Sequence, residues 1–247
     1  MASSSETGHA KNVANFDEII SNILGYNASY NPSKQSIKLD ALQVLSVNAK
    51  KGIDGVNAAM PAYSNAVAAR DAAFSPLSKL ITRILNALKA TDTTKQVDES
   101  ALTFARKIQG RRASAKKTPE EIQANAQNGK ESVQISASQM SYDSRLDNLD
   151  KLIKLLSSIE VFAPNEADLK VASLSSLYTE LKQKNTAVLS TAVPLKNARI
   201  TRNDILYKEL TGLVEVASDV KSYVKSVFGA NSPQYRQISR IRFTRQR

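Results

Sequence analysis

Two segments of this 247-residue chain resemble each other when the sequence is aligned with itself at a displacement of 132 positions. Residues 32–70 then match residues 164–202 at nine of 39 positions, without a gap. The identical residues include proline, asparagine and arginine, so a shared helical composition does not explain the match. In the first segment they are Pro32, Lys38, Leu42, Leu45, Lys50, Val56, Asn65, Ala66 and Arg70. At a displacement of 133 the match extends to residues 15–20 and 148–153, and we therefore expect a tandem duplication.

Each copy is predicted to contain three helices. Isoleucine and leucine at helical spacing predict the first helix over residues 12–25 and again over residues 144–159. The second helix is expected to begin at Pro32 in one copy and at Pro164 in the other, because proline suits the first turn of a helix.

Pro61 and Pro194 predict a kink or turn between the second and third helices, because proline lacks the amide hydrogen that a helix interior uses. Apolar residues then outline the third helices within residues 77–88 and 206–227. We expect the long second and third helices of each copy to pair antiparallel and to form a four-helix core. The predicted fold class is therefore all-α, a helical bundle made of two tandem three-helix repeats.

The pattern divides the chain into four parts. Residues 1–11 are expected to be a flexible N-terminal tail, and residues 12–109 form helical repeat 1. Residues 110–140 are a polar, basic connector with a short helix that starts near Thr118, where a threonine cap precedes proline and two glutamates. Residues 141–247 form helical repeat 2 with a basic C-terminal tail.

Four stretches resemble a family of hypothetical helical proteins from Bacteroidetes bacteria. They are GHAKNVANF at residues 8–16, YNPSK at residues 30–34, NARI at residues 197–200 and VFGANSPQY at residues 227–235. The resemblance spans nearly the whole chain and implies a bacterial, helical protein. The family has no assigned activity, so the resemblance implies no functional residue.

The residue types that most enzymes and metal sites need are scarce. The chain has no cysteine and one histidine, His9, which we expect to be solvent-exposed near a mobile N-terminus. The sequence lacks His-Glu-x-x-His, Gly-x-Gly-x-x-Gly and Gly-Lys-Ser/Thr motifs. Two carboxylates could act as acid and base at any sequence separation, but nothing marks such a pair. We therefore predict no enzyme, no metal and no cofactor.

The sequence shows no targeting or spanning segment. The N-terminus lacks a basic region followed by an apolar one, and no stretch approaches the roughly 20 apolar residues that cross a bilayer. The expected location is the cytoplasm, with no membrane span.

Positive charge is the remaining functional signal. The chain carries 34 lysines and arginines against 23 aspartates and glutamates, a net charge of +11. One cluster of basic residues follows the third helix in each copy. One is Arg106, Lys107, Arg111, Arg112, Lys116 and Lys117; the other is Arg236, Arg240, Arg242, Arg245 and Arg247. Such clusters either bind phosphates or carboxylates, or only keep the protein soluble.

These observations favour a non-catalytic structural or interaction protein that can associate with itself, because a duplicated chain often preserves the surfaces of an earlier homodimer. The alternative is sequence-independent binding of nucleic acid or another polyanion through the two Arg/Lys clusters. The partners predicted from sequence are thus a second copy of the chain or a polyanion.

Overall fold

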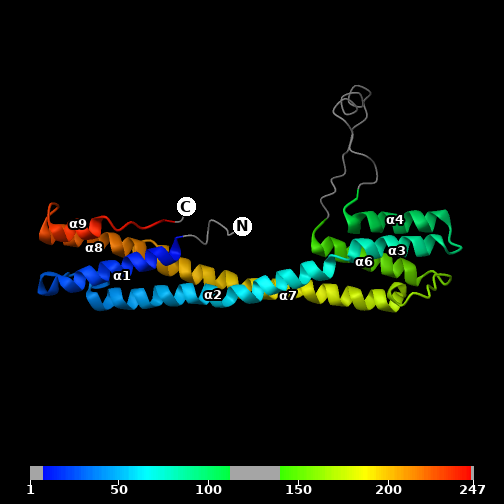
Figure 1. The fold of residues 1–247 in the computed structure, drawn as a ribbon, viewed down its shortest axis with the longest axis horizontal. Coiled ribbons are helices and arrows are strands. Elements are labelled where there is room, and N and C mark those ends of the chain that lie inside the picture. Colours follow the sequence, from blue (N-terminus) through cyan, green and yellow to red (C-terminus); the bar gives the residue numbers. More distant parts are fainter. Residues whose placement is uncertain (1–7, 112–139, 246–247) are drawn as a thin grey trace, which may run out of the picture. The chain divides into compact units, whose positions relative to one another are not determined.

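The computed structural model describes residues 8–111 and 140–245. All regular elements in these two ranges are helices, and no strand occurs in them (Figure 1). The all-α prediction is therefore confirmed.

The main helices of residues 8–111 and 140–245 fall into two sets of four, one in each range. The first set is α1 (His9–Gly25), α2 (Leu39–Phe74), α3 (Leu77–Lys89) and α4 (Lys95–Gln109). The second set is α6 (Tyr142–Ser157), α7 (Val171–Tyr207), α8 (Leu213–Phe228) and α9 (Pro233–Ser239). Short 3-10 helices are η2 (Asn27–Ser29), η3 (Gln35–Ile37) and η4 (Ala167–Leu169).

The second helix of each set begins later than its proline. Pro32 and Pro164 lie in loops, and the prediction that the helices begin there is wrong. In both sets a short 3-10 turn follows the proline and places an apolar side chain, Ile37 or Leu169, in a core. The chain is then extended for one residue before α2 or α7 starts, so burial of that side chain determines where the long helix begins.

Both long helices continue through their internal prolines. Pro61 lies inside α2 and Pro194 inside α7, so the predicted turns at these positions are wrong. Both prolines are exposed to solvent. Water can therefore take up the carbonyl that the proline leaves without a helical partner. The third helices begin only at Leu77 and Leu213, and Leu210 lies exposed in the loop before α8.

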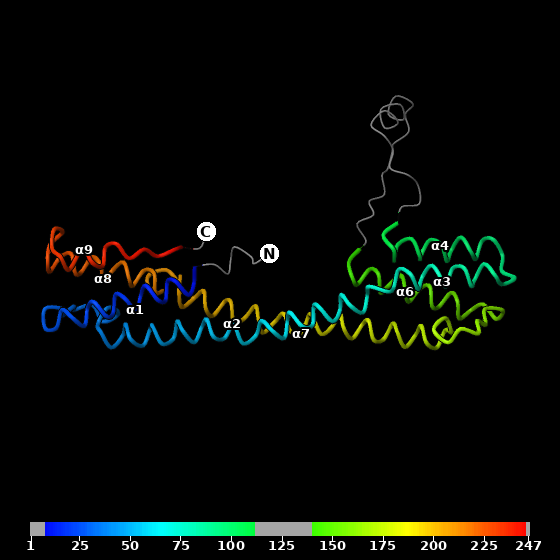
Figure 2. The backbone as a smooth tube through the Cα atoms, in the orientation of Figure 1, coloured from blue at the N-terminus to red at the C-terminus, as the bar shows by residue number. Residues whose placement is uncertain are grey.

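The described chain forms two compact units in place of the predicted four-helix core. Unit 1 comprises residues 1–64 and 191–247, and unit 2 comprises residues 65–190. The chain passes from one unit to the other within α2 and within α7, each of which is unbroken at that point (Figure 2).

Each unit takes helices from both sides of residues 112–139. The core of unit 1 combines side chains of α1 and early α2 with those of late α7, α8 and α9. The core of unit 2 combines side chains of α3 and α4 with those of α6 and early α7. Helix α1 packs on α8 and α9, and α4 packs on α6. The apolar faces predicted from the sequence therefore meet partners from the other half of the chain.

Gly55 offers a test of the exposed face of α2. It lies inside the helix, and a Cβ added there meets nothing within 4 Å. Because glycine in a helix interior costs about 0.5–1 kcal/mol relative to alanine, we expect Gly55→Ala to stabilise the protein by that amount. Urea unfolding followed by circular dichroism measures the gain.

Gly52 is the matched control on the same helix. A Cβ there would lie 3.3 Å from both Arg202 Cα and Ile205 Cδ1, so the new contacts oppose the gain in helix propensity. We expect a lower unfolding midpoint for Gly52→Ala than for Gly55→Ala. Equal midpoints would contradict the close packing at Gly52.

Candidate polyanion-binding groove

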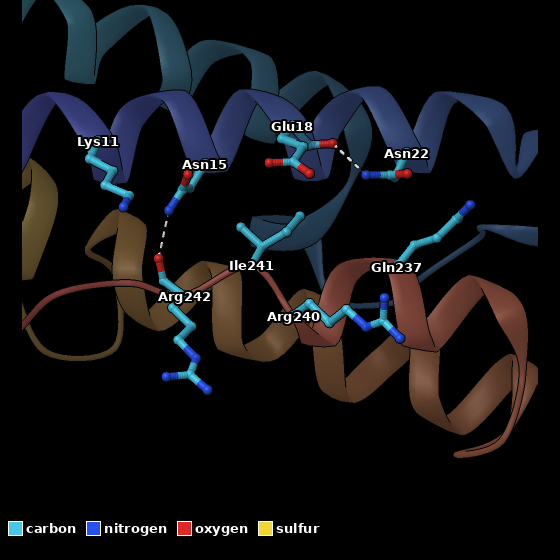
Figure 3. Close-up of a pocket in the computed structure, with 8 residues that line it drawn as sticks. All are labelled: Lys11, Asn15, Glu18, Asn22, Gln237, Arg240, Ile241 and Arg242. Carbon is cyan, nitrogen blue, oxygen red and sulfur yellow. Dashed lines mark hydrogen bonds between the residues drawn. The ribbon is translucent and has the colours of Figure 1, made fainter.

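After α9 the chain leaves the helix at Arg240, which keeps helical backbone angles, and residues 241–245 continue without regular structure. We call residues 240–245 the C-terminal arm. It lies along α1 in unit 1 (Figure 3). Ile241 is buried and Phe243 packs against the core of the unit, whereas Arg240 and Arg242 are exposed. Successive side chains of an extended segment point to opposite sides, so the two apolar anchors direct the intervening Arg242 outward.

Side chains of α1 and α8 hold the main chain of the C-terminal arm. The Asn12 amide makes two hydrogen bonds with Thr244: its Nδ2 donates to the carbonyl (2.8 Å) and its Oδ1 accepts from the amide (2.9 Å). Asn15 Nδ2 donates to the Arg242 carbonyl at 2.6 Å, and Lys221 Nζ donates to the Ile241 carbonyl. Side chains thus satisfy the carbonyls of Ile241, Arg242 and Thr244 and the amide of Thr244.

The half-buried hydroxyl of Tyr207 also bonds Asn12. Tyr207 Oη lies 2.7 Å from His9 Nδ1, and it also accepts a hydrogen bond from Asn12 Nδ2 at 3.3 Å. Burial raises the pKa of Tyr207, and burial lowers the pKa of Lys221. Tyr207 therefore helps to orient the Asn12 amide that binds the arm.

His9 corrects one expectation from the sequence. It is the first residue of α1 and is only 4% exposed, so the prediction of a solvent-exposed histidine is wrong. Its ring packs on Tyr207 with 5.6 Å between ring centroids, because α1 starts at the place where α7 ends.

A groove of about 500 Å³ lies between α1 and the segment formed by α9 and the arm (Figure 3). Its lining contains three cationic side chains and one carboxylate. The lining residues are Lys11, Asn15, Glu18, Asn22, Gln237, Arg240, Ile241 and Arg242.

The three cations of the groove are available to a ligand. Within residues 8–111 and 140–245, the side chains of Lys11, Arg240 and Arg242 form no ion pair. Figure 3 shows Lys11 reaching from α1 toward the arm, while the Arg242 guanidinium extends away from α1. The hydrogen bonds that hold the arm involve its main chain, so the guanidinium groups of Arg240 and Arg242 are not needed to hold it.

The second predicted cluster is only partly at this groove. Arg240 and Arg242 line it. Arg236 lies in the last turn of α9 outside the lining, and Arg245 pairs with Glu215 at 2.8 Å. Arg247 is outside the described residues.

The first predicted cluster belongs to unit 2. Arg106 and Lys107 lie in the last turn of α4, and the exposed Arg111 follows it. Arg112, Lys116 and Lys117 are outside the described residues. The short helix predicted near Thr118 also lies there. The two clusters thus fall in different units.

Lys11 is the groove residue that the sequence did not predict. It precedes Arg240 by more than two hundred residues, and nothing near it distinguishes it from other surface lysines. Only the packing of the C-terminal arm on α1 brings these cations together.

The described ranges contain neither a cluster suited to a metal ion nor a helix able to span a membrane. No group of three or more histidine, aspartate or glutamate side chains there is arranged to hold a metal ion. In the same ranges, none of the helices has the length and apolar character required for crossing a bilayer.

No family model, curated protein or solved structure matches this chain. The resemblance to a bacterial family of hypothetical proteins therefore stays a prediction.

Proposed function

We propose that this chain is a non-catalytic interaction protein that binds a polyanion, in particular the phosphate backbone of nucleic acid, along the groove between α1 and the C-terminal arm. One observation carries the proposal. Lys11, Arg240 and Arg242 line a single groove, and none of them forms an ion pair in the described part of the chain.

The mode of binding follows from the groove's chemistry. Its cations can contact phosphates and release counterions, which gives affinity without base sequence preference. The aromatic side chain of the arm, Phe243, packs against the core of unit 1 and does not line the groove. A platform for stacking single-stranded bases is therefore not part of this groove. We infer contact with backbone phosphates.

Glu18 opposes the three cations. Its carboxylate lines the same groove, and no ion pair among the described residues uses it. It limits how closely a phosphate can approach the α1 side of the groove, because like charges repel at short distance. The groove is therefore suited to a ligand whose affinity comes from contacts of several separate phosphates.

Replacing the three groove cations tests the proposal. We expect Lys11→Gln/Arg240→Gln/Arg242→Gln to weaken binding of a labelled DNA duplex by roughly tenfold or more at low salt, and to reduce the slope of log affinity against log salt by about three. Fluorescence anisotropy at several salt concentrations measures both. Glu18→Gln is expected to strengthen binding.

The control removes the same charge elsewhere. Lys79, Lys89 and Lys182 are exposed lysines of unit 2. Their replacement by glutamine should affect binding much less. Equal weakening by both triple variants, or no binding by the natural chain at low salt, would refute the groove as the binding site.

We also propose that the tandem duplication is the origin of the fold. Two aromatic contacts support it. Phe74, the last residue of α2, packs on Tyr142, the first residue of α6, with 4.8 Å between ring centroids. Tyr207, the last residue of α7, packs on His9, the first residue of α1. The displacement of 133 that aligns residues 15–20 with 148–153 also relates Phe74 to Tyr207 and His9 to Tyr142.

A further inference from the structure

The C-terminal arm is bound as an extended peptide ligand is bound. Among the described residues, its main-chain bonding to another backbone group is limited to Ile241, whose amide donates to the Ile238 carbonyl. Its other main-chain partners are the side chains of Asn12, Asn15 and Lys221. A main chain recognised by side chains is typical of a bound peptide.

The surface that holds the arm is a cleft that binds both its main-chain groups and its apolar side chains. We define the arm cleft as Asn12 and Asn15 of α1, Lys221 of α8 and the core surface beneath Ile241 and Phe243. Asparagine and lysine recognise main-chain groups, and the core surface accepts apolar side chains at alternate positions. The Lys221 ammonium also lies 5.2 Å from the centre of the Phe243 ring.

The side chains that recognise the arm lie on helices of unit 1. With the arm in place Asn12 is only 1% exposed, and its Nδ2 donates both to Tyr207 Oη and to the Thr244 carbonyl. Lys221 and Asn15 project from the interiors of α8 and α1. The recognising groups therefore belong to helices whose positions are set by the core of unit 1.

We propose that the arm cleft also binds the C-terminal arm of a second copy of this chain, so that two copies associate by exchanging arms. The occupant is a second copy because its arm offers the same main-chain groups to Asn12, Asn15 and Lys221 and the same two apolar anchors. Exchange conserves all of these contacts, which makes it a low-cost route to a dimer. Six residues can extend by about 20 Å once released from α1.

This inference does not rest on the proposed polyanion binding. Arg240 and Arg242 take part in the groove through their side chains, whereas exchange depends on main-chain groups and on Ile241 and Phe243. The test therefore uses a readout without any anionic ligand.

Cysteine pairing between copies tests the exchange, because the natural chain has no cysteine. A Cβ on Gly8 would lie 3.4 Å from Thr244 Cβ, close to the separation in a disulfide. The double variant Gly8→Cys/Thr244→Cys should form a disulfide within one chain, and this checks the geometry. Gly8 has a φ of 87°, so a side chain there strains the backbone, and the melting temperature of the reduced double variant measures that cost. Failure of the disulfide to form in a chain that keeps the natural melting temperature would overturn the proposed cleft.

Mixing the two single variants then tests whether the copies exchange their C-terminal arms. Chains with Gly8→Cys and differently tagged chains with Thr244→Cys are mixed at high concentration under mild oxidation. We expect disulfide-linked heterodimers in several-fold excess over a mixture of Thr244→Cys with Ser29→Cys, an exposed position of unit 1. Equal yields in the two mixtures would overturn the proposal.

Peptide competition identifies the main-chain contacts. A synthetic peptide of residues 240–245, added in excess, should lower the yield of heterodimer. The same peptide with a methylated amide nitrogen at the position of Thr244 cannot donate to Asn12 Oδ1 and should compete several-fold less well. Equal competition by both peptides would overturn main-chain recognition by Asn12.

Discussion

Cleavage of the chain within residues 112–139 is expected to leave two fragments that remain folded and bound to each other. The N-terminal fragment contributes α1 and early α2 to the core of unit 1, and α3 and α4 to the core of unit 2. The C-terminal fragment contributes the remaining helices of both cores. Neither fragment holds a complete core, so each needs the other to bury its apolar side chains.

The buried residues show how strong this dependence is. Phe16 and Ile19 of α1 are fully buried in the same core as Val220 and Val224 of α8. In unit 2, Ile108 of α4 is fully buried in one core with Leu149 of α6. Separating the fragments would expose all of these side chains, at about 1.5–3 kcal/mol for each large one.

The measurement uses the whole chain with a protease site placed in residues 112–139. After cleavage, size-exclusion chromatography should show one peak that contains both fragments, with an unchanged far-ultraviolet circular dichroism spectrum. The melting temperature should then depend on protein concentration, unlike that of the uncleaved chain. Elution as two separate folded species, or loss of helix on cleavage, would contradict the mixed composition of the cores.

Replacement of Gly212 by alanine is expected to destabilise the protein by about 2–3 kcal/mol, the upper part of the range for overpacking. A Cβ there would lie 2.6 Å from the Lys208 nitrogen, 2.7 Å from the Lys208 oxygen and 2.9 Å from the Tyr207 carbonyl carbon. These are backbone atoms and cannot rotate away. The backbone angles of Gly212, φ −70° and ψ 154°, suit alanine, so the loss would come from the collision alone.

The loop around Gly212 is a sensitive place for such a collision. The Gly212 amide donates to the Lys208 carbonyl at 2.7 Å and closes the turn between α7 and α8. Leu206 before the turn and Leu213 after it are both fully buried in the core of unit 1. Any backbone movement that admits a Cβ therefore moves one of these side chains.

Urea unfolding measures this effect, and Gly25→Ala provides the control. A Cβ on Gly25 meets nothing within 4 Å, so its replacement should change the stability by less than about 1 kcal/mol. A Gly212→Ala protein as stable as the natural chain would show that the turn can relax without disturbing α8.

Local features of the fold were predictable from the sequence, and the pairing of helices was not. The spacing of apolar residues predicted α1, α3 and α6 within a few residues of their ends. Proline was misleading, because α2 contains the exposed Pro61 without a turn there. Helix α4 was missed, although Val97, Ala101 and Ile108 lie at helical spacing.

The pairing of helices depends on contacts between residues far apart in the chain. An apolar face on α1 shows that the helix needs a partner, but not that the partner is α8. The candidate groove has the same origin, since Asn12 and Thr244 are separated by 232 residues. The arginines of the C-terminal cluster were evident from composition, whereas their position beside Lys11 required the packed structure.

The division of the chain between the two units has a consequence for protein synthesis. Unit 2 is continuous in sequence and can fold as its residues leave the ribosome, but α1 must wait for α8 and for Ile241. At about 5–20 residues per second, the 177 residues from 64 to 241 take roughly 9–35 s to translate. Throughout that interval Phe16, Ile19 and Ile23 of the nascent chain lack their native cover and are a natural target for a chaperone.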